Sequence, residues 1–231
     1  MTIIATRLQA VRNRIAAAAQ AAGRPAGDIQ LIAVSKTFPA ADIAEAQQAG
    51  QIAFAENYVQ EAVSKIATLA GTRISWHFIG PIQSNKTKQI AELFDWAHGI
   101  DRLKVAERLS TARPEGARPL DICIQVNISG ELSKSGVPPQ EALSLARAVH
   151  GLPGIRLRGL MGIPEPDSNA SLMRARFRQI RELRDDIIAA GIAMDTLSMG
   201  MSDDLEAAIA EGATMVRVGR AIFGDRPSPP R

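Results

Sequence analysis

Two alternating patterns of apolar residues run along the chain. Short runs rich in valine, isoleucine and alanine, typical of buried strands, are separated by longer segments in which apolar residues recur at helical spacing. In the run 120–128 every second residue is leucine, isoleucine or valine, so one face is apolar. The runs predicted as strands are residues 29–35, 52–55, 74–79, 95–98, 120–128, 155–161, 196–198 and 214–218.

Helices are predicted between these strands. An additional amphipathic helix, residues 2–22, precedes the first strand. Ser202 is expected to cap the helix that starts there, with Asp203 and Asp204 complementing the positive end of the helix dipole. The remaining predicted helices are residues 39–49, 58–70, 85–94, 102–112, 140–149 and 169–190, with a short helical turn after Gly219.

Strands that alternate with helices predict a parallel sheet covered by helices. Eight such units favour a single closed (β/α)8 TIM-type barrel, with an extra N-terminal helix, over an open doubly wound sheet. The sequence lacks the G-x-G-x-x-G fingerprint that follows a strand in dinucleotide-binding folds. No change in composition divides the chain, so we expect one barrel domain, residues 1–225, and a flexible proline-rich tail, residues 226–231.

The composition narrows the class of protein. Hydrophobic residues make up 46% and charged residues 22% of the 231 residues, a balance typical of globular proteins. The net charge of +3, from 27 basic and 24 acidic residues, is too even to indicate a nucleic-acid-binding stripe. No secretory signal is recognisable, and no apolar run approaches the ~18 residues of a membrane span. The single cysteine, Cys123, fits a reducing compartment, so we expect a cytoplasmic protein that binds neither nucleic acid nor membranes.

The first predicted strand leads into Lys36. Of the six lysines, it is the only one that directly ends a Val/Ile-rich strand. Such a strand is expected to be buried on both faces, so the ammonium would be partly desolvated and the amine nucleophilic near neutral pH. A lysine of this kind can form a Schiff base. The alternative, which this residue taken alone favours, is a lysine that extends from the strand end into solvent.

Polar and small residues end the other strands. In a (β/α)8 barrel the site lies at the carboxyl ends of the strands, and a phosphate site built from the loops after strands seven and eight recurs there. Backbone N–H groups of Gly219 and Arg220, with the Ser198 hydroxyl, could bind that phosphate. An equally good interpretation of Ser198 is that it is a strand-end serine whose hydroxyl makes a local hydrogen bond. The strand-end residues are Lys36, Asn57, His77, Asn127, Met161, Ser198 and Arg217.

The eighth strand places Val216 and Val218 on one face and Met215 and Arg217 on the other. If the valines face the helices, Arg217 points into the barrel, where a buried guanidinium needs an acceptor. That acceptor is either a ligand or a buried carboxylate such as Asp121. A lysine, a phosphate site and an inward arginine in one barrel mouth suggest pyridoxal 5′-phosphate (PLP).

A set of short segments carries a family resemblance. They are residues 33–37 (AVSKT), 56–58 (ENY), 76–86 (WHFIGPIQSNK), 133–136 (SKSG), 158–161 (RGLM), 198–203 (SMGMSD) and 216–219 (VRVG). Together they resemble the pyridoxal phosphate homeostasis protein family, relatives of the barrel domain of alanine racemase. The resemblance extends from about residue 5 to Asp225.

The resemblance implies a PLP Schiff base on Lys36, phosphate contacts from the segments after strands seven and eight, and Arg217 facing the pyridine nitrogen. Phe38 stands where some family members have a second lysine, so an auxiliary lysine is missing there. Arg220 stands where many have serine or threonine, and its guanidinium or backbone would have to replace the hydroxyl contact. The cofactor-binding residues that we predict are Lys36, Asn57, His77, Met161, Ser198, Gly200, Arg217, Gly219 and Arg220.

Three classes of function are compatible with these residues. The first is a non-catalytic PLP carrier in intracellular vitamin B6 homeostasis, which would pass the cofactor to PLP-dependent apo-enzymes. The second is a PLP-dependent amino-acid racemase, and the third is a phosphate-binding isomerase without the cofactor. Racemisation needs a second base; alanine racemase uses a tyrosine of its partner subunit, whereas the only tyrosine here is Tyr58, at a predicted helix start. An arginine at the pyridine nitrogen also keeps that nitrogen unprotonated, because two positive charges repel, and the ring is then a poorer electron sink. We therefore rank the carrier first. We also expect the protein to be a monomer.

Other charged residues receive structural interpretations. The three histidines, His77, His98 and His150, lack metal-ligand spacing, which disfavours a zinc site. The arginines within residues 174–184 are interpreted as a solvated helix face. Lys134, in the loop after the fifth strand, is a candidate for accepting or passing on the cofactor.

Overall fold

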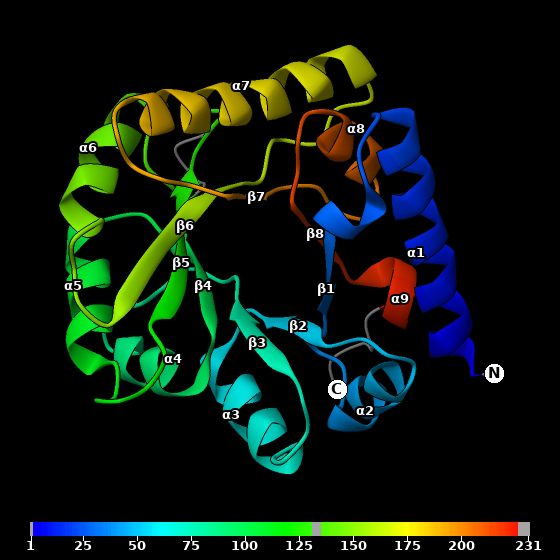
Figure 1. The fold of residues 1–231 in the computed structure, drawn as a ribbon. Coiled ribbons are helices and arrows are strands. Elements are labelled where there is room, and N and C mark those ends of the chain that lie inside the picture. The colour runs from blue at the N-terminus through cyan, green and yellow to red at the C-terminus, as the bar shows by residue number, and fades with distance from the viewer. Residues whose placement is uncertain (1, 131–134, 226–231) are drawn as a thin grey trace.

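The computed structural model describes residues 2–130 and 135–225. Its centre is a closed barrel of eight parallel strands surrounded by helices (Figure 1). The strands follow one another around the barrel in chain order and the eighth pairs with the first, which confirms the predicted (β/α)8 fold. They are β1 (Gln30–Val34), β2 (Ala53–Glu56), β3 (Ser75–Phe78), β4 (Trp96–Ile100), β5 (Leu120–Val126), β6 (Ile155–Gly162), β7 (Thr196–Ser198) and β8 (Met215–Val218).

Helices connect the strands and form the outer layer. The predicted N-terminal helix is present as α1; it buries Leu8, Val11 and Ile15 and packs along α8 and α9 (Figure 1). A short 3-10 turn, η1 (Ala26–Asp28), leads into β1. The helices are α1 (Ile3–Ala21), α2 (Ala40–Gln48), α3 (Val59–Thr68), α4 (Thr87–Leu93), α5 (Leu103–Ala112), α6 (Pro139–Val149), α7 (Ala170–Ala189), α8 (Leu205–Ala210) and α9 (Arg220–Phe223).

The two faces of the strands contribute to two separate cores. Outward residues such as Val216 and Val218 pack with the helices in the larger core. Inward residues, among them Met161 and Met215, form a smaller core within the barrel. Since side chains alternate along a strand, Arg217 lies on the inward face, as the sequence pattern predicted.

Most element boundaries differ from the prediction by one to three residues; β5, for example, ends at Val126 instead of residue 128. β4 continues to Ile100 instead of ending at residue 98, and its pairing with β5 shifts register between Ala97 and Ile100. α8 begins at Leu205, so the prediction that Ser202 caps this helix is wrong. Asp204 occupies the cap position, and its carboxylate accepts the Met201 N–H at 2.5 Å within a preceding turn.

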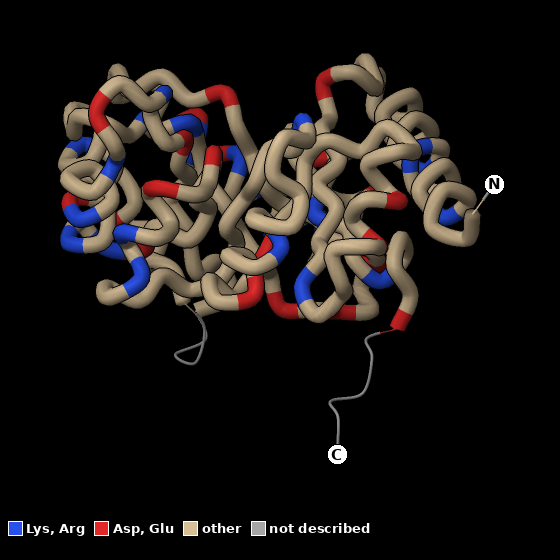
Figure 2. The backbone as a smooth tube through the Cα atoms, turned by 90° about the horizontal axis from the view of Figure 1, so that it is seen from below, with Lys and Arg blue, Asp and Glu red and all other residues tan. Residues whose placement is uncertain are grey.

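Charged residues of both signs are interspersed along the chain, as Figure 2 shows. This distribution agrees with the small net charge of +3. Within residues 2–130 and 135–225, none of the helices combines the length and the apolar character needed to cross a membrane.

Candidate functional site

A cavity of about 560 Å³ opens at the carboxyl ends of β1, β2 and β8. The predicted contact residues that line it are Lys36, Asn57, Arg217, Gly219 and Arg220. The structure therefore brings the proposed nucleophile, the inward arginine and the segment after β8 to one cavity.

The other predicted contacts lie outside this lining. His77, Met161 and Ser198 are fully buried in the barrel. Gly200, at φ +94°, packs against α8, where a Cβ atom would come within 2.6 Å of the Ala208 Cβ. The structure thus gives these residues positions behind the cavity wall.

Lys36 lies in a tight turn just after β1. The Phe38 N–H donates to the Ser35 carbonyl at 3.0 Å, so Lys36 and Thr37 are the two central residues of a hydrogen-bonded turn. Thr37 has φ +70°, a conformation that β-branched residues rarely adopt and that costs about 1–3 kcal/mol. Lys36 is half-buried and lines the cavity. The amine is therefore carried by a strained turn, not by the strand itself.

Arg217 is buried, with only 3% of its surface exposed. It donates to the Ser198 hydroxyl at 2.8 Å and to the Gly162 carbonyl at 3.0 Å. Burial lowers its pKa to about 10, which leaves the guanidinium charged at neutral pH. Within the part of the chain that the structure describes, its hydrogen-bond partners are thus neutral groups, while its side chain also lines the cavity.

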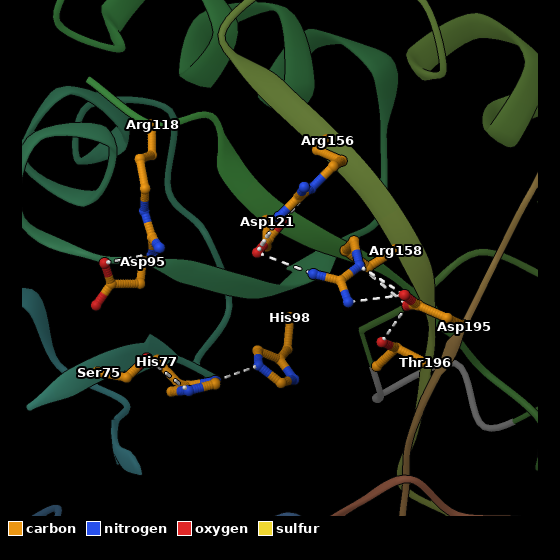
Figure 3. A network of polar contacts seen from close by, with 10 residues as sticks. All are labelled: Ser75, His77, Asp95, His98, Arg118, Asp121, Arg156, Arg158, Asp195 and Thr196. Atoms are coloured by element: carbon orange, nitrogen blue, oxygen red, sulfur yellow. Dashed lines mark hydrogen bonds and ion pairs between the residues drawn. The ribbon is translucent and has the colours of Figure 1, made fainter. Parts of the chain in front are cut away.

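The alternative pairing of Arg217 with Asp121 is wrong. Asp121 lies at the other end of the barrel, near the start of β5, and accepts hydrogen bonds from Arg156 at 2.6 Å and Arg158 at 3.1 Å (Figure 3). Arg158 also binds Asp195 at 2.7 Å. This network settles the orientation of the two β6 arginines, which point to the amino-terminal end of the barrel, away from the cavity.

A chain of hydrogen bonds extends behind Arg217 through the barrel interior. Ser198 Oγ lies 2.8 Å from His98 Nδ1, and His98 Nε2 lies 3.0 Å from His77 Nδ1. His77 Nε2 in turn lies 3.2 Å from the Ser75 hydroxyl (Figure 3). Burial lowers the pKa of His77 to about 3 and holds that of His98 well below its usual range, with His77 and Arg217 adding to the effect on His98. Both imidazoles are therefore neutral.

The predicted phosphate side of the cavity is formed by the segments after β7 and β8. At Gly219 a Cβ atom would lie 3.1 Å from the Val34 carbonyl oxygen, so glycine allows this segment to pack closely on β1. The Arg220 guanidinium binds Asp203 at 2.6 Å, and both residues line the cavity. Ser202 also lines it, and its carbonyl accepts a hydrogen bond from Arg14 of α1 at 3.0 Å.

Apolar residues that the sequence argument did not select complete the wall. Phe38, at the position of the missing lysine, lines the cavity and stacks on Phe223 with ring centroids 5.1 Å apart. Ile79 and Ile163 follow β3 and β6. Their positions just after strand ends were the available signal, but strand-end isoleucines carry no chemistry that would single them out.

The arginines of α7 differ from their predicted role. Arg174, Arg178 and Arg181 all contact the carboxylate of Glu211, whose side chain is 1% exposed. They are therefore partners of a buried acid, not a freely solvated face. Among the described residues there is no group of histidine, cysteine and acidic side chains suited to hold a metal ion. Lys134 lies outside the described residues, so its predicted role stays a prediction.

The family model, the relatives and the solved structure each match almost the whole chain. A family model for the alanine racemase N-terminal domain matches residues 6–227. Proteins named pyridoxal phosphate homeostasis protein are 57% identical over 226 residues in Pseudomonas aeruginosa and 53% identical over 235 residues in Escherichia coli. These alignments cover 98% of this chain and 97% and 98% of the two relatives. PipY of Synechococcus elongatus, solved with PLP bound, is 38% identical and superposes with a TM-score of 0.83 over 96% of this chain and 100% of its own.

Proposed function

Because this chain belongs to the pyridoxal phosphate homeostasis protein family, we propose that it binds PLP covalently through Lys36 and carries the cofactor without turning over a substrate. The observation that supports this most directly is that Lys36 and Arg217 line one cavity. PLP supplies an aldehyde that condenses with a primary amine and releases water.

The residues present fit this cofactor. Arg217 brings to the cavity a buried cation whose hydrogen-bond partners are a hydroxyl and a carbonyl, so its charge can act on a ligand's ring nitrogen. A cation there disfavours protonation of that nitrogen. Gly219 leaves the backbone of the segment after β8 exposed to the cavity, as a phosphate contact would require. Arg220 is already paired with Asp203, so we assign the phosphate contact to backbone groups.

A carrier is favoured over a racemase by the position of Tyr58. It is the only tyrosine, it is 58% exposed, and it lies outside the residues that line the cavity. Lys36 then has no tyrosine opposite it to serve as a second base. His77 and His98 are not suited to that role, because both are fully buried and lie outside the residues that line the cavity. We propose further that the protein works as a cytoplasmic monomer and that PLP-dependent apo-enzymes receive its cofactor.

The covalent bond is tested by absorption spectroscopy and chemical trapping. The purified protein should turn yellow with PLP, and borohydride reduction followed by peptide mass mapping should place the adduct on Lys36. An adduct confined to other lysines would overturn the assignment. Racemase assays across the amino acids test the competing function: turnover above background that Lys36→Ala abolishes would make the protein an enzyme.

A further inference from the structure

We propose that Lys65 is a positioning residue for Lys36, because it joins two glutamates in a cluster that binds the residues on both sides of Lys36, Ser35 and Thr37. We call Lys65, Glu56 and Glu61 the Lys65 cluster. The inference rests on the proposed function, in which Lys36 forms the bond to PLP.

The cluster holds the first residue of the turn, Ser35. Lys65 Nζ donates to the Ser35 carbonyl at 2.8 Å, the same oxygen that accepts the Phe38 N–H and closes the turn. The Ser35 hydroxyl donates to Glu56 Oε1 at 2.6 Å, and Lys65 Nζ binds that same oxygen at 2.8 Å. Ser35 and Glu56 are fully buried, and Lys65 is 5% exposed. The backbone just before Lys36 is therefore fixed by buried, charge-assisted hydrogen bonds.

The cluster also holds the residue after Lys36. Glu61 Oε1 accepts the Thr37 N–H at 2.6 Å and binds Lys65 Nζ at 2.5 Å. Thr37 is the residue with φ +70°, a conformation that persists only where surrounding contacts impose it. A Glu61 carboxylate drawn into place by Lys65 is such a contact. Lys65 thus acts on one flank of Lys36 directly and on the other through Glu61.

The arrangement follows from where the three residues lie in the fold. Glu61 and Lys65 are four residues apart on α3, so they share one helix face. Glu56 ends β2, the strand next to β1. One face of α3 and the end of β2 therefore meet the turn after β1. Lys65 itself is engaged by three oxygens and lies outside the cavity lining, which suits it to support the nucleophile and not to replace it.

The test distinguishes an effect on the position of Lys36 from effects on folding and on PLP affinity. Glu61→Ala removes the acceptor of the Thr37 N–H at a side chain that is 26% exposed, so the fold should tolerate it. Glu61→Gln keeps an acceptor oxygen and serves as the conservative variant. Lys65→Met removes the ammonium, and Lys88→Met, at a lysine 79% exposed on α4, is the matched control. For each folded variant, the rate of borohydride-trapped Lys36 adduct formation is measured across PLP concentrations.

We expect Glu61→Ala and Lys65→Met to lower the rate at saturating PLP by about ten- to a hundredfold, as a misplaced reacting group does. The PLP concentration that gives half the maximal rate should stay within about twofold, since the cavity wall is unchanged. Glu61→Gln and Lys88→Met should react at nearly the wild-type rate. Without cofactor, hydrogen exchange at the Thr37 amide should accelerate in Glu61→Ala but not in Lys88→Met.

The outcomes separate this inference from the proposed function. No adduct on Lys36 in the wild-type protein would overturn the proposed function and this inference with it. A wild-type adduct together with an unchanged saturating rate in Glu61→Ala would overturn this inference alone. If Lys65→Met does not fold cooperatively, the comparison of Glu61→Ala with Glu61→Gln decides. A saturating rate that is lost in Glu61→Ala and retained in Glu61→Gln supports the inference. Equal rates in the two variants overturn it.

Discussion

Arg217 donates a hydrogen bond to the Ser198 hydroxyl over 2.8 Å, and a guanidinium can only donate. The Ser198 hydroxyl keeps its single proton to donate, and its other partner is Nδ1 of His98. We therefore assign the proton of His98 to Nε2, from which it is donated to His77 Nδ1, and the proton of His77 to Nε2, facing Ser75. In this assignment every hydrogen bond of the chain points from Ser198 towards Ser75.

Arg217→Gln should weaken PLP binding while leaving the fold intact. We expect a loss of about 1–3 kcal/mol in affinity, the range for hydrogen bonds that involve a charged group. The pyridine nitrogen should also protonate more easily, so the pH profile of the bound spectrum should shift. Spectral titration measures both, with Arg147→Gln, at an exposed position of α6, as the control.

The same variant should not show the ~3–5 kcal/mol loss that follows a broken buried ion pair. Its hydrogen-bond partners are Ser198 and a backbone carbonyl, so the substitution leaves no carboxylate without its hydrogen-bond partner. A large drop in cofactor-free stability with unchanged PLP affinity would remove Arg217 from the site.

Lys36→Ala should abolish the covalent bond and spare the fold. The side chain is half-buried and follows β1, outside the two apolar cores. We expect the free energy of unfolding to change by no more than about 1 kcal/mol. Non-covalent PLP binding should persist through Arg217 and the segment after β8. Thermal unfolding and equilibrium dialysis check both points; loss of cooperative unfolding would show that Lys36 is structural.

The buried histidines should make the protein lose stability in mild acid. Burial lowers the folded-state pKa of His77 to about 3, whereas an imidazole in the unfolded chain titrates near ~6.5. Between these values the unfolded state binds a proton that the folded state does not, so the free energy of unfolding falls as the pH drops below ~6.5. At about pH 5, His77 alone should account for about 2 kcal/mol of the loss.

Urea unfolding at a series of pH values measures this dependence. His77→Gln should have a shallower fall in stability between about pH 6.5 and 5 than the wild-type protein. His150→Gln is the matched control, because His150 is exposed at the end of α6. Identical pH dependence in His77→Gln and the wild-type protein would contradict the assignment of a neutral buried imidazole.

Glu211→Gln should destabilise the packing of α7 on α8. The substitution removes the carboxylate that Arg174, Arg178 and Arg181 share. We expect a cost of about 1.5–3 kcal/mol, the range for hydrogen bonds to charged groups, and a smaller cost at high salt. Denaturant titration of Glu211→Gln beside Glu182→Gln, at an exposed acid on α7, measures the difference. Equal stabilities would show that the arginines are simply solvated.

The barrel could be predicted because it follows from hydrophobic patterns within short segments of the sequence. Short strand-type runs that alternate with longer helical segments predict a parallel sheet covered by helices. Eight such units favour a closed barrel. The same alternation placed Arg217 inward, since Val216 and Val218 had to face the helices. Lys36 was selected as a candidate from its position after an apolar run, and its role stays a prediction. These inferences depend on residues close together in the sequence.

The remaining features depend on contacts between distant segments. Glu211 meets α7 across a separation of 30 residues or more, which no helix periodicity reveals. The contact of His98 with Ser198 joins β4 to β7 across the barrel interior. The turn at Lys36 was also hidden, because its φ of +70° falls on a threonine, a residue that gives no signal for a left-handed conformation.

Helix α1, in the outer layer, supports one residue of the cavity wall, Ser202. Arg14 holds the Ser202 carbonyl, and Arg12 holds the carbonyl of Ala49 after α2. The smallest module that an engineer could excise as a cofactor barrel therefore begins with α1, not with β1. Cleavage of the chain between α1 and β1 should likewise weaken the binding site, because it would free the helix that holds the Ser202 carbonyl.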